Sequence, residues 1–249
     1  MKKAIFFLTV VTLLAAACGG QKTDRQAAQN DSISSFQRIA GDSALYGLAC
    51  DGCTDSIIVF LPYEGGKLDT FDIIDAFQHM RVLGRPHIGD ELAIIPNPQD
   101  SAEALMVINM EVLKGTWAYQ VSPMLRNVEN MPRKMQRRML EHMPDSLKQL
   151  LMVPREYSLR LKRDNTALAR GGEFHHTTDD MSPVEYPAVR RYTEWHLYNG
   201  MLILKADTIA GFTREGDVPH IDTVAIRFLM QDSLVLEFPD HTQSYYRKE

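Results

Sequence analysis

Leu113–Tyr119, with the sequence LKGTWAY, decides how the C-terminal half of this chain folds. Gly115 stands two places before Trp117, at the start of a stretch in which side chains alternate. A period of two predicts a β-strand with one buried face. The stretch therefore predicts the opening strand of a β unit, with Trp117 and Tyr119 on the same face.

Several hairpins are predicted after this strand. Tyr157–Lys162 turns at Asp164–Asn165, and Tyr192–Leu197 reaches Asn199–Gly200, a dipeptide typical of two-residue hairpin turns. Three more strands complete the pattern at Asp222–Phe228, Ser233–Phe238 and Tyr245–Lys248. The C-terminal half is thus predicted to be a sequence of antiparallel strands.

The Gly-x-Trp opening followed by hairpins resembles lipocalin and lipocalin-like barrels. The resemblance implies a lipocalin-like unit over residues 113–249, in which the tryptophan closes one end of the barrel and an arginine from a late strand covers its ring. Arg247 is the first candidate for that arginine, and Arg227 is the second. It also implies a ligand pocket or barrel floor, for which the expected residues are Trp117, Tyr119, Trp195, Leu197 and Arg247, although core packing alone would place them similarly.

A helical insertion is predicted at residues 130–152. Methionines recur at helical spacing from Met131 to Met143, and Pro144 is expected to begin a second short helix. The methionine stripe is interpreted as core or lid packing, with thioether ligation of Cu(I) as the alternative. The other face carries Arg133, Lys134, Arg137 and Arg138, which indicates either a solvated face or a surface for anionic headgroups or a partner.

Residues 41–112 predict a small antiparallel β unit, either a closed barrel or a rolled sheet. Short apolar runs separated by turn residues predict strands at Ser56–Leu61, Phe71–Ala76, Met80–Leu83, Glu91–Ile95 and Ala104–Met110. The predicted fold class is therefore mostly β, with two small antiparallel barrel-like units and a helical insertion in the second.

Cys50 and Cys53 form a Cys-x-x-Cys turn before a predicted strand. A small structural disulfide, a thiolate pair for Cu(I) or Zn(II), a redox pair and two idle thiols all remain open. The stretch around Cys50-Asp51-Gly52-Cys53 resembles NlpE-type envelope lipoproteins, except that Ala49 replaces the usual proline. That resemblance implies an oligonucleotide-fold-like domain beside the lipocalin-like one, and a link to surface, copper and envelope-stress signalling.

The N-terminus predicts export and lipid attachment. Lys2 and Lys3 precede the apolar run 4–14, and three alanines lead to Cys18. This pattern resembles a bacterial lipoprotein signal, with residues 1–17 as the signal peptide and 18–40 as a flexible tether. Cys18 is then the site of acylation, palmitate included, and the expected location is the bacterial cell envelope, with the outer membrane as first choice.

Composition narrows the function classes. The formal net charge of -5 becomes -7 after removal of Lys2 and Lys3, which argues against a nucleic-acid binder. No nucleophile elbow, metalloprotease, Walker or dinucleotide motif occurs in the sequence. His175-His176 with Asp179-Asp180 is the one metal-compatible loop, and it lacks a regular ligand spacing.

The predicted function is therefore non-enzymatic binding of a small apolar molecule or an envelope partner, without a cofactor. An NlpE-like sensor of a metal or oxidant, using Cys50 and Cys53, is the alternative. An enzyme of unrecognised class comes third.

Overall fold

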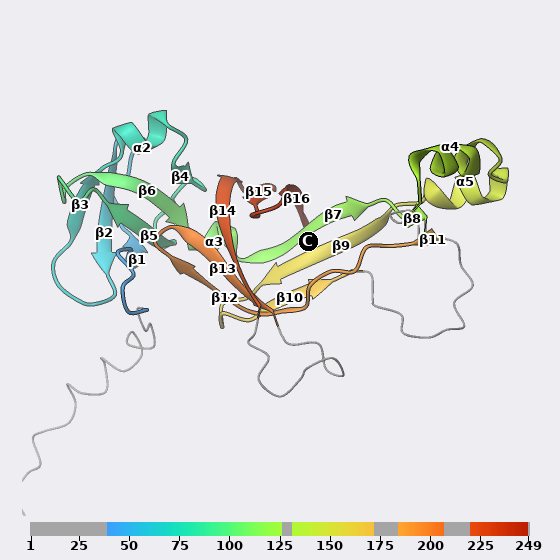
Figure 1. The fold of residues 1–249 in the computed structure, drawn as a ribbon. Helices are drawn as coiled ribbons and strands as arrows, with labels where there is room; N and C mark the ends of the chain where they lie inside the picture. The colour runs from blue at the N-terminus through green and yellow to red at the C-terminus, as the bar shows by residue number, and fades with distance from the viewer. Residues whose placement is uncertain (1–38, 126–130, 172–183, 207–219, 249) are drawn as a thin grey trace, which may run out of the picture. The chain divides into compact units, whose positions relative to one another are not determined.

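β-Strands make up most of the secondary structure, as the sequence predicts (Figure 1). The computed structural model describes residues 39–125, 131–171, 184–206 and 220–248. These residues belong to one compact unit, Ile39–Glu249. Within the described residues, no helix is both long and apolar enough to cross a bilayer.

The first sheet has six strands in the order β3-β2-β1-β5-β6-β4. A parallel bridge between Asp72 and Glu103 joins the end of β3 to the start of β6, and the Asp72 amide donates to the Ala102 carbonyl at 2.8 Å. The strands β3, β2, β1, β5 and β6 therefore form a closed barrel. The elements of this part are β1 (Leu45–Ala49), β2 (Ile57–Pro62), β3 (Asp69–Asp72), α2 (Ile74–Gln78), β4 (Val82–Leu83), β5 (Glu91–Pro96), β6 (Ala104–Asn109) and α3 (Met110–Leu113).

This first barrel has a well-defined apolar core. Its strand order, with a helix between the third and fourth barrel strands, is that of the five-stranded oligonucleotide- and oligosaccharide-binding fold. The fully buried side chains of this core include Ile58, Phe60, Leu92 and Ile94. The rings of Phe60 and Phe71 pack edge to face, with 5.9 Å between their centroids. The predicted small antiparallel unit is thus a closed barrel.

One predicted strand of this half is wrong. Phe71–Ala76 is not a single strand, because β3 ends at Asp72 and α2 begins at Ile74. The Asp72 carboxylate accepts a hydrogen bond from the Ile74 amide at 2.8 Å, which turns the chain out of the sheet. Ile73 and Ala76 are both buried, a spacing of three that fits a helix better than a strand.

Asn109 ends the strand that the sequence extends to Met110. Its side-chain oxygen accepts hydrogen bonds from the amides of Glu111 and Val112 at 3.0 and 3.1 Å, so it caps the short helix α3. Its amide group donates to Asp90 at 2.7 Å. The fully buried Asn109 thereby fixes where the first barrel ends and where Gly115 begins the second sheet.

The second sheet has eight strands in the order β10-β9-β7-β16-β15-β14-β13-β12, all antiparallel. Except for β10 and β12, each strand pairs with the next strand of the sheet along the chain, and the last pairs with the first. A bridge between Thr166 and Glu194 links the two edge strands, so the barrel is nearly closed. Its strands are β7 (Gly115–Val121), β9 (Arg155–Leu161), β10 (Ala167–Arg170), β12 (Tyr192–Tyr198), β13 (Met201–Ala206), β14 (Ile221–Leu229), β15 (Ser233–Glu237) and β16 (Thr242–Lys248).

This eight-stranded up-and-down connectivity is that of lipocalins, which confirms the lipocalin-like fold class. The final strand starts at Thr242, three residues earlier than predicted. Hydrogen bonds also link the two barrels: the Tyr46 hydroxyl donates to the Leu197 carbonyl at 3.2 Å, and the Gly84 amide donates to the Leu229 carbonyl at 2.9 Å.

The helical insertion lies between β7 and β9, the first two strands of the second barrel (Figure 1). It contains α4 (Arg133–Glu141) and α5 (Asp145–Leu151), with Pro144 just before α5 as predicted. A two-stranded ribbon of β8 (Met124–Leu125) and β11 (Val184–Glu185) flanks it. Met143 is buried but Met135 is 58% exposed, so the methionine stripe is not a continuous core face.

Candidate functional site

Trp117 is a fully buried side chain on the first strand of the second barrel. Its indole N–H donates to the Leu113 carbonyl at 2.8 Å. Arg247, on β16, is the residue that pairs with Trp117 in the sheet, and its guanidinium lies 4.2 Å from the centroid of the Trp117 ring. The predicted contact is therefore present, and it involves Arg247 and not Arg227, which pairs with Glu237.

Arg247 also explains the glycine of the Gly-x-Trp motif. The guanidinium donates to the carbonyl oxygens of Val112 and Lys114, the latter at 3.0 Å. Gly115 has φ of +136°, and a Cβ at this position would overlap the guanidinium. Glycine thus lets Arg247 cross the start of β7 to reach the face of Trp117.

Trp195 and Leu197 belong to the packed part of the same barrel. They are 1% and 3% exposed, and the indole N–H of Trp195 donates to the Lys162 carbonyl at 2.9 Å. Neither residue lines the two cavities described below, of about 290 and 880 Å³, and the same holds for Trp117 and Arg247. Of the five residues predicted for a pocket or barrel floor, Tyr119 alone lines one of these two cavities, the smaller one.

That cavity has a volume of about 290 Å³ and is lined by strands of the second barrel together with residues 187–190, 238, 240 and 241. This is close to the lower end of the range of about 300–1,000 Å³ for ligand pockets. Three tyrosines from three different strands line it: Tyr119, Tyr192 and Tyr245. The rings of Tyr119 and Tyr245 pack edge to face, with 5.0 Å between their centroids. The rest of the lining is mostly apolar and includes Leu159, Ala169, Pro187, Ala188, Val189 and Phe238.

Two phenol hydroxyls in this cavity lack a protein partner. Neither Tyr119 nor Tyr245 donates or accepts a side-chain hydrogen bond within the described part of the chain, and neither hydroxyl is sealed from solvent. Burial raises the pKa of Tyr119 to about 12 and also raises the pKa of Tyr245. Both groups therefore remain protonated at neutral pH, as donors available to a bound molecule.

The charged groups beside the cavity neutralise each other. Asp222 is 5% exposed and accepts hydrogen bonds from Arg190 at 2.6 Å, from the Tyr192 hydroxyl at 2.7 Å and from His220 at 3.0 Å. Burial opposes ionisation of Asp222, but these hydrogen bonds outweigh it and lower its pKa. The positive charge of Arg190 at the cavity wall is thus matched by the carboxylate behind it.

Asp222 predicts a pH-dependent stability. A carboxylate with a lowered folded-state pKa stabilises the fold above its unfolded pKa of about 3.9, and this stabilisation is lost as the pH falls through the folded-state pKa. We expect Asp222→Asn to lower the unfolding free energy by about 2 kcal/mol at pH 7. The difference from the parent protein should shrink as the pH falls below about 4. Urea unfolding at a series of pH values measures it.

The exposed pair Arg227–Glu237 provides the control for this prediction. The Glu237 side chain is 40% exposed, so Glu237→Gln should change the unfolding free energy by less than about 1 kcal/mol. An Asp222→Asn effect that is equally small, or that does not depend on pH, would contradict the assigned role of the cluster.

The Cys-x-x-Cys turn lies in the first barrel, between β1 and β2. Both cysteines are half-buried free thiols, and Cys53 accepts a hydrogen bond from the Val59 amide at 3.4 Å. Within the described residues, no group of three or more His, Cys, Asp or Glu side chains is placed to hold a metal ion. The disulfide, metal and redox interpretations of Cys50 and Cys53 stay predictions.

Cys53 borders a larger hollow of about 880 Å³. Its apolar wall includes Phe77 and Ile88, which are 53% and 69% exposed, and Arg85 forms an ion pair with Asp55 at 3.5 Å in the same wall. The two hollows are about equally open to solvent. We take the smaller one as the candidate ligand site, because tyrosines from three different strands line it and two of their hydroxyls have no hydrogen-bond partner among the described residues.

Several predicted features lie outside the described residues. They are the lipid attachment at Cys18, the signal peptide and most of the tether, and the loop with His175-His176 and Asp179-Asp180.

Sequence reasoning missed Tyr192, Tyr245, Arg190 and Asp222. Tyr245 had a usable signal, because it stands two residues before Arg247 on the same strand. If Arg247 faces Trp117, then Tyr245 faces Tyr119. The pairing of Arg190 with Asp222 had no such signal, because the two residues are far apart in the sequence.

No protein-family model and no curated protein matches the sequence. Among solved structures, the chain is similar to the crystal structure of a lipocalin-like protein from Bacteroides thetaiotaomicron. The sequence identity is 16% and the TM-score is 0.29. The match covers 54% of this chain and 95% of that chain.

Proposed function

We propose that this protein is a non-enzymatic binding module that holds a small, uncharged, largely apolar molecule in the cavity of its second barrel. One observation carries the proposal: Tyr119 and Tyr245 line a mostly apolar cavity, and their hydroxyls have no hydrogen-bond partner among the described residues. A bound molecule with an acceptor can replace water as the hydrogen-bond partner of these hydroxyls, while its apolar part is buried against the rest of the lining. The two donors select a molecule with an oxygen acceptor, such as a carbonyl or ether.

The pairing of the arginine in the lining argues against an anionic ligand. Arg190 is held by the carboxylate of Asp222, and Asp240 adds a negative charge to the lining. An anionic ligand would lose its hydration in the cavity without gaining a free cation from Arg190. Apolar contacts and one or two hydrogen bonds are therefore the expected source of affinity.

The site of action that we propose is the bacterial cell envelope, with the protein held on a membrane by acyl chains on Cys18. The support is the sequence of residues 1–18, in which two lysines, an apolar run and three alanines lead to the cysteine. Metabolic labelling with palmitate tests the anchor: label that persists in Cys18→Ser would exclude it.

The ligand proposal is tested with prodan, a neutral naphthalene dye that carries a ketone and changes its emission in apolar surroundings. We expect saturable binding of prodan, and about five- to thirtyfold weaker binding by the double variant Tyr119→Phe/Tyr245→Phe, since the ketone loses one or two hydrogen bonds of about 1 kcal/mol each. The dye without its ketone, dimethylaminonaphthalene, should bind both proteins equally. The unliganded double variant should unfold within about 0.5 kcal/mol of the parent, because the hydroxyls bond nothing in the protein.

Three outcomes would contradict the ligand proposal. No saturable binding of either dye, or equal affinity of parent and double variant for prodan, would refute the assigned ligand class. A large loss of stability in the double variant would show that the hydroxyls serve the fold.

A further inference from the structure

The helical insertion carries an unbalanced positive charge. Residues 131–141 hold four basic side chains and one acidic one, Glu141. All four basic side chains are exposed, and none has an ion pair or hydrogen-bond partner within the part of the chain that the structure describes; they are Arg133, Lys134, Arg137 and Arg138. Four like charges on one short helix repel each other, which favours an external anionic partner.

This charge is opposite to that of the surrounding protein. Residues 1–38 contain five basic and two acidic side chains, so Ile39–Glu249 has a formal net charge of -8. In an acidic protein, a helix with four unpaired basic side chains is a local positive region that a negative surface attracts. Charge complementarity thus singles out the insertion as the contact region.

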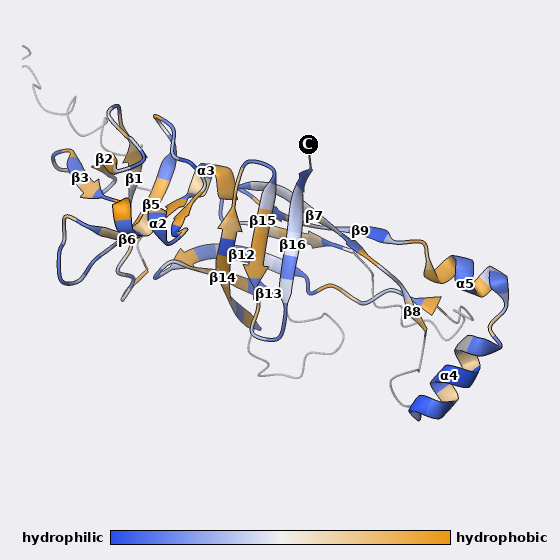
Figure 2. Ribbon diagram, turned by 90° about the horizontal axis from the view of Figure 1, so that it is seen from above, coloured by the Kyte–Doolittle hydropathy of each residue, from blue (hydrophilic) through white to orange (hydrophobic). Residues whose placement is uncertain are grey.

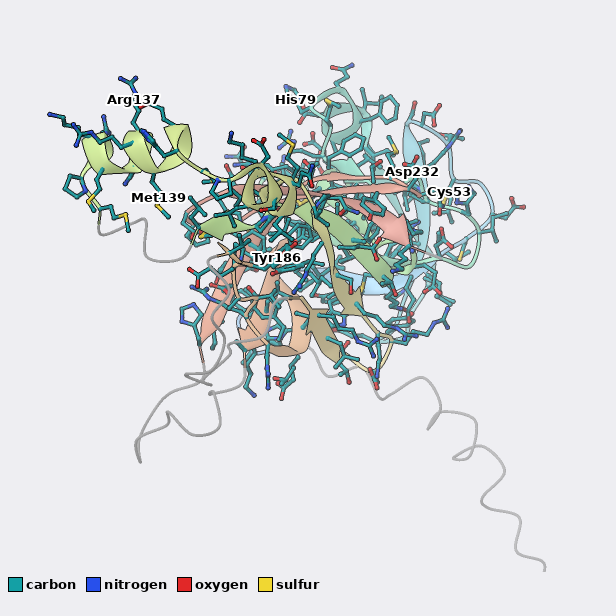
Figure 3. All side chains as sticks on the ribbon, turned by 90° about the vertical axis from the view of Figure 1, so that its right-hand side faces the viewer. Cys53, His79, Arg137, Met139, Tyr186 and Asp232 are labelled. Carbon is teal, nitrogen blue, oxygen red and sulfur yellow. The ribbon has the colours of Figure 1, made fainter. Side chains whose placement is uncertain are left out.

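Exposed apolar side chains lie in the same insertion. Met135 is 58% exposed on α4, and Figure 3 shows Arg137 and Met139 on opposite sides of that helix. Leu150, Met152 and Val153 are 53%, 81% and 54% exposed around the end of α5. Blue and orange alternate along both helices in Figure 2, as in an amphipathic segment. Among the described side chains of residues 131–153, only Met143 is buried, so the other apolar side chains of the insertion remain at least partly accessible.

The insertion is nevertheless held on the barrel. Leu125 pairs with Val184 in the ribbon of β8 and β11. The Tyr186 hydroxyl donates to the Val153 carbonyl at 2.7 Å, and the Arg155 guanidinium lies 3.9 Å from the Tyr186 ring centroid. A contact made by the insertion therefore fixes the barrel to which it is attached.

We propose that the α4–α5 insertion, residues 131–153, is a docking surface for anionic lipid bilayers. The four basic side chains meet the headgroups, and the exposed methionine, leucine and valine side chains enter the interfacial region. Basic charge on one face with apolar side chains on the other is the pattern of helices that lie in a membrane interface. A purely electrostatic protein partner would leave the exposed Met152 and Leu150 without a role. This proposal does not depend on the ligand cavity.

The test uses the soluble unit Ile39–Glu249, which contains every described strand and its partners and lacks Cys18. Co-sedimentation is measured with vesicles of phosphatidylcholine alone and with an equimolar mixture of phosphatidylcholine and phosphatidylglycerol. We expect binding to the anionic vesicles only, weakening as salt is added. Each basic side chain near an anionic surface contributes roughly fivefold in affinity, so Arg137→Gln/Arg138→Gln should weaken binding more than tenfold.

Arg160→Gln/Arg170→Gln is the matched control, because both arginines are exposed on β9 and β10 and have no ion-pair partner among the described residues. It removes the same charge and should change binding less than threefold. Met152→Ser should weaken binding severalfold while all four cations remain. Circular dichroism of each variant checks that the fold is kept.

Three results would overturn the proposal. They are no binding of the parent unit to anionic vesicles, equal binding to neutral and anionic vesicles, and an equal loss in the two arginine double variants. The first would favour a protein partner for this surface, and the third would indicate attraction by net charge alone.

Discussion

Replacing Trp117 with alanine is expected to lower the unfolding free energy by about 3–5 kcal/mol, as for other buried aromatic side chains. The indole is completely buried, its N–H is bonded to the Leu113 carbonyl and its face is covered by Arg247. The variant thus loses packing, one hydrogen bond and the partner of a guanidinium. Domains are stable by only about 5–15 kcal/mol, so this loss is a large fraction of the total unfolding free energy.

Urea unfolding measured by circular dichroism tests this prediction. Phe77→Ala is the control, because this aromatic side chain is 53% exposed and its removal should cost less than about 1 kcal/mol. Trp195 is then the remaining tryptophan in Trp117→Ala, so its fluorescence reports whether the barrel keeps its structure. A loss below about 1.5 kcal/mol would contradict the role of Trp117 as a main packing residue of the barrel.

Filling the cavity is the second change with a large expected effect. Ala169 lines the cavity from β10, and Ala169→Phe places a ring in the space of about 290 Å³. We expect prodan affinity to fall more than tenfold, because the ligand and the new ring compete for the same volume. The fluorescence titration described above measures the affinity, and thermal unfolding shows that the variant is folded.

The neighbouring residue supplies the matched control. Leu168 lies on the opposite face of β10 and is 36% exposed, so Leu168→Phe puts a similar ring outside the barrel. Its prodan affinity should stay within about twofold of the parent value. Equal losses in the two variants, or none in Ala169→Phe, would place the dye elsewhere.

The sequence predicted the barrel because its decisive signals are local. Gly115 and Trp117 mark the first strand, and Asn199–Gly200 marks a hairpin whose strands pair as expected. Arg247 was identified because the lipocalin resemblance requires a late arginine, and the structure places it on Trp117.

The features that were missed depend on contacts between distant residues or on a single polar side chain. Asp72 turns the chain into α2 through one hydrogen bond, which alternation of apolar residues does not reveal. Tyr192 reaches Asp222 from a strand with an irregular register between Tyr192 and Glu194, so counting by twos along β12 misplaces it. The cavity exists because small and aromatic side chains from several strands leave a gap, and no local pattern encodes that gap.

A crystal structure of Ile39–Glu249 grown with prodan tests the central claim most directly. The account predicts density for the dye between Tyr119 and Tyr245, with its ketone oxygen within about 3 Å of at least one phenol hydroxyl. A cavity filled by the protein's own side chains, or the dye bound only outside the barrel, would contradict it.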